Sequence, residues 1–132
     1  MNAFGFIYVA ALLNIVSKGP AIVWLIRNKG RYNNHNPRSQ YQDNPTIQRL
    51  YAAHNNTLEG FPLFAAGMIA GHIVQLDPGI IMACGWSFIV ARVLYVYLYA
   101  LDWHWQRSSV WFVGWLASLL PLILAGFAHI GS

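Results

Sequence analysis

Two ionisable side chains lie inside long apolar stretches of the sequence, and they are the first candidates for chemistry. Glu59 lies in a segment that begins polar and turns apolar, and Arg92 is the one lysine or arginine between residues 50 and 106. Each lies about ten residues from the polar end of its segment, or about 15 Å along a helix. A charge at that depth costs at least about 2.5 kcal/mol on insertion scales. We therefore predict a buried Glu59–Arg92 ion pair, with Asn55 or Asn56 as a further hydrogen-bond partner.

The predicted pair has two interpretations. Removing one member of a buried ion pair typically costs about 3–5 kcal/mol, so the pair can simply fix the register of two antiparallel helices. Alternatively, the same two side chains can both hold the helices together and orient a ligand. The sequence leaves both interpretations open.

Polar side chains continue the face of Arg92 toward the next polar stretch. Tyr95 and Tyr99 follow at i+3 and i+7, and these spacings put them on the same helix face. Together with Arg107 and Ser108 beyond the loop, they predict a polar path from the middle of the membrane to its surface. Such a path suits an anionic, partly apolar ligand. The structural alternative is an aromatic belt with Arg107 as an interfacial anchor.

The composition determines which elements position these residues. Of 132 residues, 57% are hydrophobic and 9% are charged, whereas a soluble domain carries about 25% charged residues. The chain is therefore predicted to be an all-α integral membrane four-helix bundle that forms one domain over residues 1–132. The apolar segments predict spans at about residues 3–26, 46–74, 79–101 and 108–129, with a polar cytoplasmic loop at residues 27–45.

Helix boundaries are marked by a few residues. Lys18-Gly19-Pro20 interrupts the first span and predicts a kink there, with Lys18 reaching an interface or the bundle interior. Asn44 followed by Pro45 predicts the start of the second long helix. Ser108 or Ser109 is the predicted N-cap of the last helix.

The distribution of charge predicts the orientation. Five basic residues cluster between the first and second spans, which indicates a cytoplasmic loop and places both termini on the other side. They are Arg27, Lys29, Arg31, Arg38 and Arg49. This placement argues for a membrane role of the basic charge and against nucleic-acid binding. With the single cysteine Cys84 and scattered histidines, no metal site is predicted.

The residues resemble a known family at this point. The pattern is Arg49-x4-His54-x-Asn56-x2-Glu59-x2-Pro62-x-Phe64, followed by Arg92-x2-Tyr95-x3-Tyr99 and then by Arg107-Ser108. It resembles the MAPEG family, the membrane-associated proteins in eicosanoid and glutathione metabolism. The similarity covers essentially the whole chain, and the length and composition resemble a bacterial member, which implies the bacterial inner membrane.

The resemblance implies a homotrimer that binds glutathione, as a co-substrate, between neighbouring subunits at the cytoplasmic end. It implies a transferase or peroxidase that acts on hydrophobic electrophiles arriving from the lipid. Arg107 would stabilise the glutathione thiolate near the start of the fourth helix, next to Ser108. The implied glutathione-binding residues are Arg49, Asn55, Asn56, Glu59, Arg92, Tyr95 and Tyr99, with Arg31 and Arg38 of the loop as further candidates.

Two other functions stay open. Ala52 and Asn55 occupy positions where eicosanoid-producing members carry arginine, which favours a non-enzymatic member of the family that binds lipid or another small amphiphile. A small multidrug transporter also has four spans and one buried glutamate. In that class the glutamate lies in the first span, where this chain has Lys18 and no acidic residue.

Overall fold

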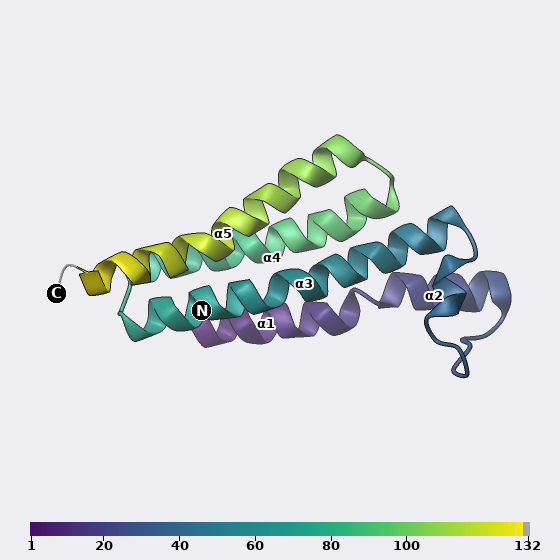
Figure 1. The fold of residues 1–132 in the computed structure, drawn as a ribbon, viewed down its shortest axis with the longest axis horizontal. Helices are drawn as coiled ribbons and strands as arrows, with labels where there is room; N and C mark the ends of the chain where they lie inside the picture. Colours follow the sequence, from purple (N-terminus) through teal and green to yellow (C-terminus); the bar gives the residue numbers. More distant parts are fainter. Residues whose placement is uncertain (131–132) are drawn as a thin grey trace.

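The chain folds into a bundle of long helices, which a computed structural model describes for residues 1–130 (Figure 1). The elements are α1 (Ala3–Val16), α2 (Gly19–Lys29), the 3-10 helix η1 (Ser39–Gln42), α3 (Pro45–Ile73), α4 (Pro78–Ala100) and α5 (His104–Ile130). Within residues 1–130 there is no strand. Helices α1 and α2 together make one arm, so four antiparallel helical segments form the bundle. The predicted all-α membrane bundle is confirmed.

The apolar segments are long enough to cross a membrane. In the described part of the chain, three segments satisfy both length and hydropathy: Ala3–Lys29, Pro78–Ala100 and His104–Ala128. Helix α3 is the fourth segment, and its 29 residues correspond to about 43 Å. It is less apolar because its first half carries Arg49, His54 and Glu59. This half brings polar groups into the bundle.

The first arm breaks where the sequence predicts a kink. Helix α1 ends at Val16 and α2 begins at Gly19, with Pro20 in its first turn. The Ser17 hydroxyl lies 2.8 Å from Nδ1 of the buried His54 on α3, so the break is held to the bundle by a hydrogen bond. The ammonium group of Lys18 lies 5.7 Å from the centre of the Tyr32 ring. Lys18 thus reaches toward the loop end of the molecule.

Helix α3 begins with a side-chain cap, as the sequence predicts. The Asn44 side chain accepts a hydrogen bond from the amide of Ile47 at 3.0 Å, and Pro45 occupies the first turn. The same device begins α4, where the Asp77 carboxylate accepts from the amide of Gly79 at 2.8 Å. Both starts therefore satisfy helix amides that would otherwise lack partners.

The predicted start of the last helix is wrong. Helix α5 begins at His104, four residues before Ser108. Ser108 and Ser109 are therefore inside the helix, where their hydroxyls donate to carbonyls one turn earlier, at 3.0 and 3.1 Å. Serine can be satisfied in this way within a helix, so its presence alone does not mark an N-cap.

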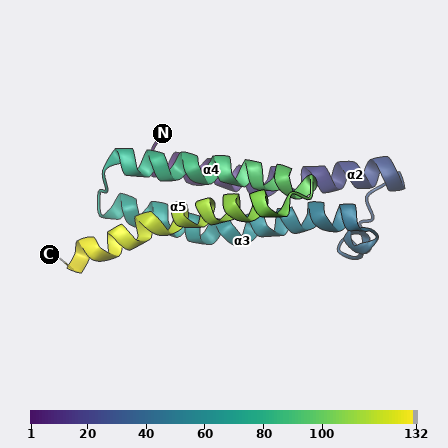
Figure 2. The same ribbon diagram turned by 90° about the horizontal axis from the view of Figure 1, so that it is seen from above.

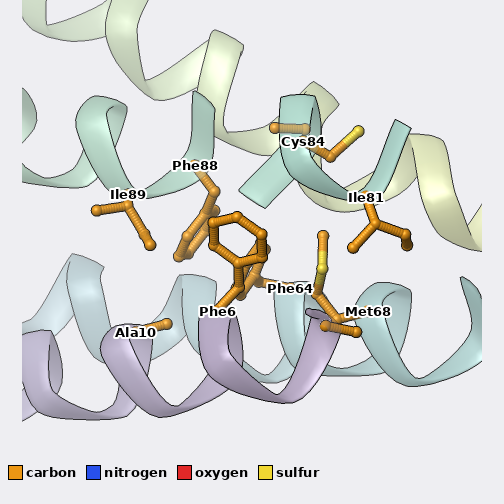
Figure 3. Packing of buried hydrophobic residues seen from close by; sticks show 10 residues of the cluster. Phe6, Ala10, Phe64, Met68, Ile81, Cys84, Phe88 and Ile89 are labelled. Carbon is orange, nitrogen blue, oxygen red and sulfur yellow. The ribbon is translucent and has the colours of Figure 1, made fainter. Parts of the chain in front are cut away.

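The apolar core lies where α1, α3 and α4 meet (Figure 3). The rings of Phe64 and Phe88 stack face to face at 3.8 Å, and Phe6 packs from α1. Close approach is possible because Gly85 has no side chain: a Cβ there would lie within 2.5 Å of the Phe6 ring. The core fixes the mutual positions of α3 and α4, one turn away from the polar residues described below.

The long loop and the α4–α5 turn lie at one end of the bundle, and the start of α1 and the end of α5 lie toward the other (Figures 1 and 2). Here α2 and the start of α3 extend beyond the α4–α5 turn (Figure 1). The loop is anchored by Tyr41 of η1, whose ring stacks on Tyr51 of α3 at 3.9 Å. Tyr41 is buried, and this burial raises the pKa of its phenol. The loop end is thus packed against the membrane helices.

Candidate functional site

Arg92 is at the centre of the polar residues in the bundle. Its side chain is only 3% exposed, and it reaches from α4 to α3. Nη1 of Arg92 donates to Oδ1 of Asn56 at 2.7 Å and also contacts the Asn56 carbonyl at 3.4 Å. The predicted contact between Arg92 and an asparagine is therefore confirmed, with Asn56 as the partner.

The predicted Glu59–Arg92 ion pair is not formed within the chain. Among the side chains of residues 1–128, the one ion pair within 4.0 Å joins Lys29 and Asp43 in the loop region. Glu59 lies on the exposed side of α3. The side-chain oxygen of Asn56, one turn earlier, accepts the hydrogen bond from the Arg92 guanidinium instead. A neutral acceptor can hydrogen-bond to a buried cation without the free-energy cost of removing a second charge from water. The prediction is thus wrong about the partner of Arg92.

Aromatic side chains connect Arg92 to the end of the bundle in the order that the helix spacing predicts. The Arg92 guanidinium carbon lies 5.7 Å from the centre of the Tyr95 ring. The rings of Tyr95 and Tyr99 pack edge to face at 5.6 Å. The guanidinium of Arg107, in the first turn of α5, lies 4.1 Å above the Tyr99 ring. Asn56, Arg92, Tyr95, Tyr99 and Arg107 form a continuous row, called the polar row below.

The turn between α4 and α5 brings Tyr99 and Arg107 together. Asp102 adopts φ 61°, a left-handed conformation that closes the end of α4. The amide of Trp103 donates to the Leu98 carbonyl at 3.0 Å, and the amide of Asp102 donates to the Tyr99 carbonyl at 3.1 Å. This Schellman pattern ends one helix and begins the next within three residues.

A cavity of about 190 Å³ opens beside the polar row, between α3 and α5. Its lining combines polar and aromatic side chains with one glycine and one leucine: Asn56, Glu59, Arg92, Trp111, Trp115, Gly60 and Leu63. The buried Nε atom of Arg92 has no hydrogen-bond partner among residues 1–128, whose side chains the structure describes. The cavity therefore offers a cation with unused donors, a carboxylate and two indole rings to a ligand.

Four residues that line this cavity are not among those predicted from the sequence: Gly60, Leu63, Trp111 and Trp115. Trp111 and Trp115 stack at 6.1 Å, and they follow Arg107 at i+4 and i+8. This spacing was the available signal, since it places both rings on the Arg107 face of one helix. Gly60 had no signal of its own, because a glycine beside a glutamate in an apolar helix has many possible reasons.

Other predicted site residues lie apart from the polar row. Arg31 and Arg38 are exposed on the loop, and Ser108 is exposed with its hydroxyl on the His104 carbonyl. Arg49 and Asn55 are half-buried on α3, closer to the loop end than Asn56. In the described part of the chain, no hydrogen bond or ring contact joins any of these five to the polar row. The chain alone thus brings together only those predicted residues that form the polar row, on α3, on α4 and in the first turn of α5.

The comparison with protein families gives a match along almost the whole chain. The family model described as the MAPEG family matches residues 3–127. The matched range includes the polar row and every residue that lines the cavity beside it. No solved structure matches the chain significantly.

Proposed function

Because the chain belongs to the MAPEG family, a family of membrane proteins in glutathione and eicosanoid metabolism, we propose that it is a glutathione-dependent transferase or peroxidase. Its substrates are hydrophobic electrophiles that enter from the lipid. The polar row is the observation that carries the proposal, because it joins a buried guanidinium to a second guanidinium at the loop end.

Arg107 stabilises the glutathione thiolate in this proposal. It lies in the first turn of α5, where the helix amides and the guanidinium both favour an anion. In a transfer to a chlorinated aromatic, the thiol proton leaves to solvent, sulfur bonds to the ring carbon, and chloride departs with its electron pair. Arg92 and Asn56 hold the peptide part of glutathione deeper in the bundle.

The proposed assembly is a homotrimer in the bacterial inner membrane, with glutathione between neighbouring subunits. The exposed carboxylate of Glu59 supports self-association, because a charge on an apolar helix is stabilised when a second protein surface covers it. The basic loop and the α4–α5 turn lie at one end, which is the cytoplasmic end under the positive-inside rule. Both termini are then on the opposite side.

The test uses the full chain, purified in detergent. We expect it to conjugate 1-chloro-2,4-dinitrobenzene to glutathione, and Arg107→Ala to lower kcat/KM about 100-fold, as for loss of one donor to a reacting anion. Arg27→Ala is the control, since Arg27 is an exposed cation on α2 away from the polar row. Calorimetry that shows no binding at millimolar glutathione would overturn the proposal.

A second candidate is a non-enzymatic amphiphile binder. An apolar groove of about 410 Å³ lies between α4 and α5, and the α3 positions Ala52 and Asn55 carry no cation for a glutathione carboxylate. This function predicts that the purified chain binds a fluorescent fatty acid but neither glutathione nor its conjugates. Turnover of the chlorinated aromatic above the uncatalysed rate would exclude it.

A further inference from the structure

The guanidinium of Arg92 lies in a slot between two glycines. A Cβ added at Gly60 of α3 would lie 2.8 Å from both Cζ and Nη2 of Arg92, and 3.2 Å from Nε. A Cβ added at Gly114 of α5 would lie 3.6 Å from Nε and Nη2, which is ordinary contact distance. On the α3 side of the slot, the guanidinium therefore occupies the space that a side chain at position 60 would fill.

The slot holds Arg92 where it contacts Asn56. With its guanidinium against Gly60, Arg92 uses Nη1 for both hydrogen bonds to Asn56. Its Nε remains buried and unpaired among the described residues. Gly60 and Arg92 both line the cavity that also contains Glu59. A buried guanidinium with unused donors beside a cavity is arranged to receive an acceptor from outside the chain.

We propose that Gly60 is a positioning residue: because it has no side chain, the Arg92 guanidinium can lie against α3. In this position, a guanidinium nitrogen that does not bond to Asn56 donates to an anionic oxygen of the bound ligand. The inference rests on the proposed function, in which that ligand is glutathione and the oxygen belongs to a carboxylate. The position of the guanidinium itself can be tested without any ligand.

The first experiment measures this position directly. The full chain is labelled with ¹⁵N-arginine in detergent micelles, and the Nε–H signal of Arg92 is identified by its loss in Arg92→Lys. We expect Gly60→Ala to shift this signal, because the new Cβ must displace the guanidinium. Gly126→Ala is the matched control, since a Cβ there meets nothing within 4 Å, and it should leave the signal in place. An unshifted signal in Gly60→Ala overturns the inference.

The second experiment measures what the position does. We expect Gly60→Ala to weaken glutathione binding about ten-fold, the loss of one hydrogen bond to a charged group, without lowering the melting temperature. In an Arg92→Lys background, Gly60→Ala should weaken binding no further, because its effect passes through the guanidinium. Equal weakening in both backgrounds overturns the inference. If the wild-type chain binds no glutathione, the proposed function fails, while the Nε–H signal still decides the role of Gly60.

Discussion

Helices α3 and α4 meet in two neighbouring regions that are built in opposite ways. In the apolar region, Phe64 and Phe88 stack at 3.8 Å and are buried on all sides. One turn along α4, Arg92 is buried to a similar degree but makes its hydrogen bonds through one of three nitrogens. The first region is complete in the isolated chain, whereas the second has donors left over. The comparison separates residues that hold the bundle together from residues that are ready for a ligand.

Removal of a ring from the apolar region should have the largest effect on stability. We expect Phe64→Ala to lower the free energy of unfolding by about 3–5 kcal/mol, because it leaves a cavity under the Phe88 ring. Denaturant titration in micelles, followed by circular dichroism, measures the loss. Phe64→Leu, which keeps most of the volume, should cost less than half as much. Equal losses for the two variants would show that ring stacking, and not volume, sets the stability of this region.

The Ser17–His54 contact is polar, but its role is to stabilise the bundle and not to bind a ligand. We expect Ser17→Ala to lower the free energy of unfolding by about 1–3 kcal/mol, since it leaves the buried His54 ring nitrogen without its 2.8 Å partner. The same titration measures it, with Ser109→Ala as the exposed control. Glutathione affinity should stay unchanged. A stable Ser17→Ala variant would mean that water replaces the hydroxyl at the break between α1 and α2.

Arg92 should behave in the opposite way to Phe64. We expect Arg92→Met to keep the free energy of unfolding or raise it by about 1 kcal/mol, because an apolar side chain removes a buried charge that has no ionic partner among the described residues. Glutathione binding should be lost in the same variant. Unfolding and calorimetry on one preparation measure both properties. A loss of about 3 kcal/mol or more would show that Arg92 is part of a stabilising ion pair after all.

Glu59 should give the smallest change in stability. We expect Glu59→Gln to alter the free energy of unfolding by less than about 0.5 kcal/mol, since the carboxylate is exposed and has no cation within 4.0 Å in the described chain. Monomeric and assembled protein, separated by size, are compared in the same titration. A large loss confined to the assembled form would identify a cation on the neighbouring subunit as the partner.

Much of this arrangement could be predicted from local sequence patterns. Asn44 before Pro45 predicts the start of α3, and Lys18-Gly19-Pro20 predicts the break in the first arm, because both depend on backbone chemistry within a few residues. The order of Arg92, Tyr95 and Tyr99 also follows from helix spacing alone. These predictions hold because the relevant contacts lie within one helix or at its end.

The partner of Arg92 could not be predicted in this way. Equal depth of Glu59 and Arg92 is a statement along the helix axes, and it does not say which side of α3 faces α4. The space left at Gly60 and the contact with Gly114 of α5 determine where the Arg92 guanidinium lies, and both depend on three-dimensional packing. The early start of α5 was missed for a related reason. Asp102 closes α4 in a left-handed conformation that the sequence suggests only weakly, since glycine is the usual residue there.

The three-residue turn around Asp102 limits where insertions can be tolerated as the sequence evolves. It sets the rotational phase of α5 relative to α4, and one added residue would turn the Arg107 side of α5 by about 100°. The 4.1 Å contact between Arg107 and Tyr99 would then be lost. The loop between α2 and α3 contains no residue of the polar row. Insertions should therefore accumulate in the long loop, while the short turn keeps its length wherever the polar row is retained.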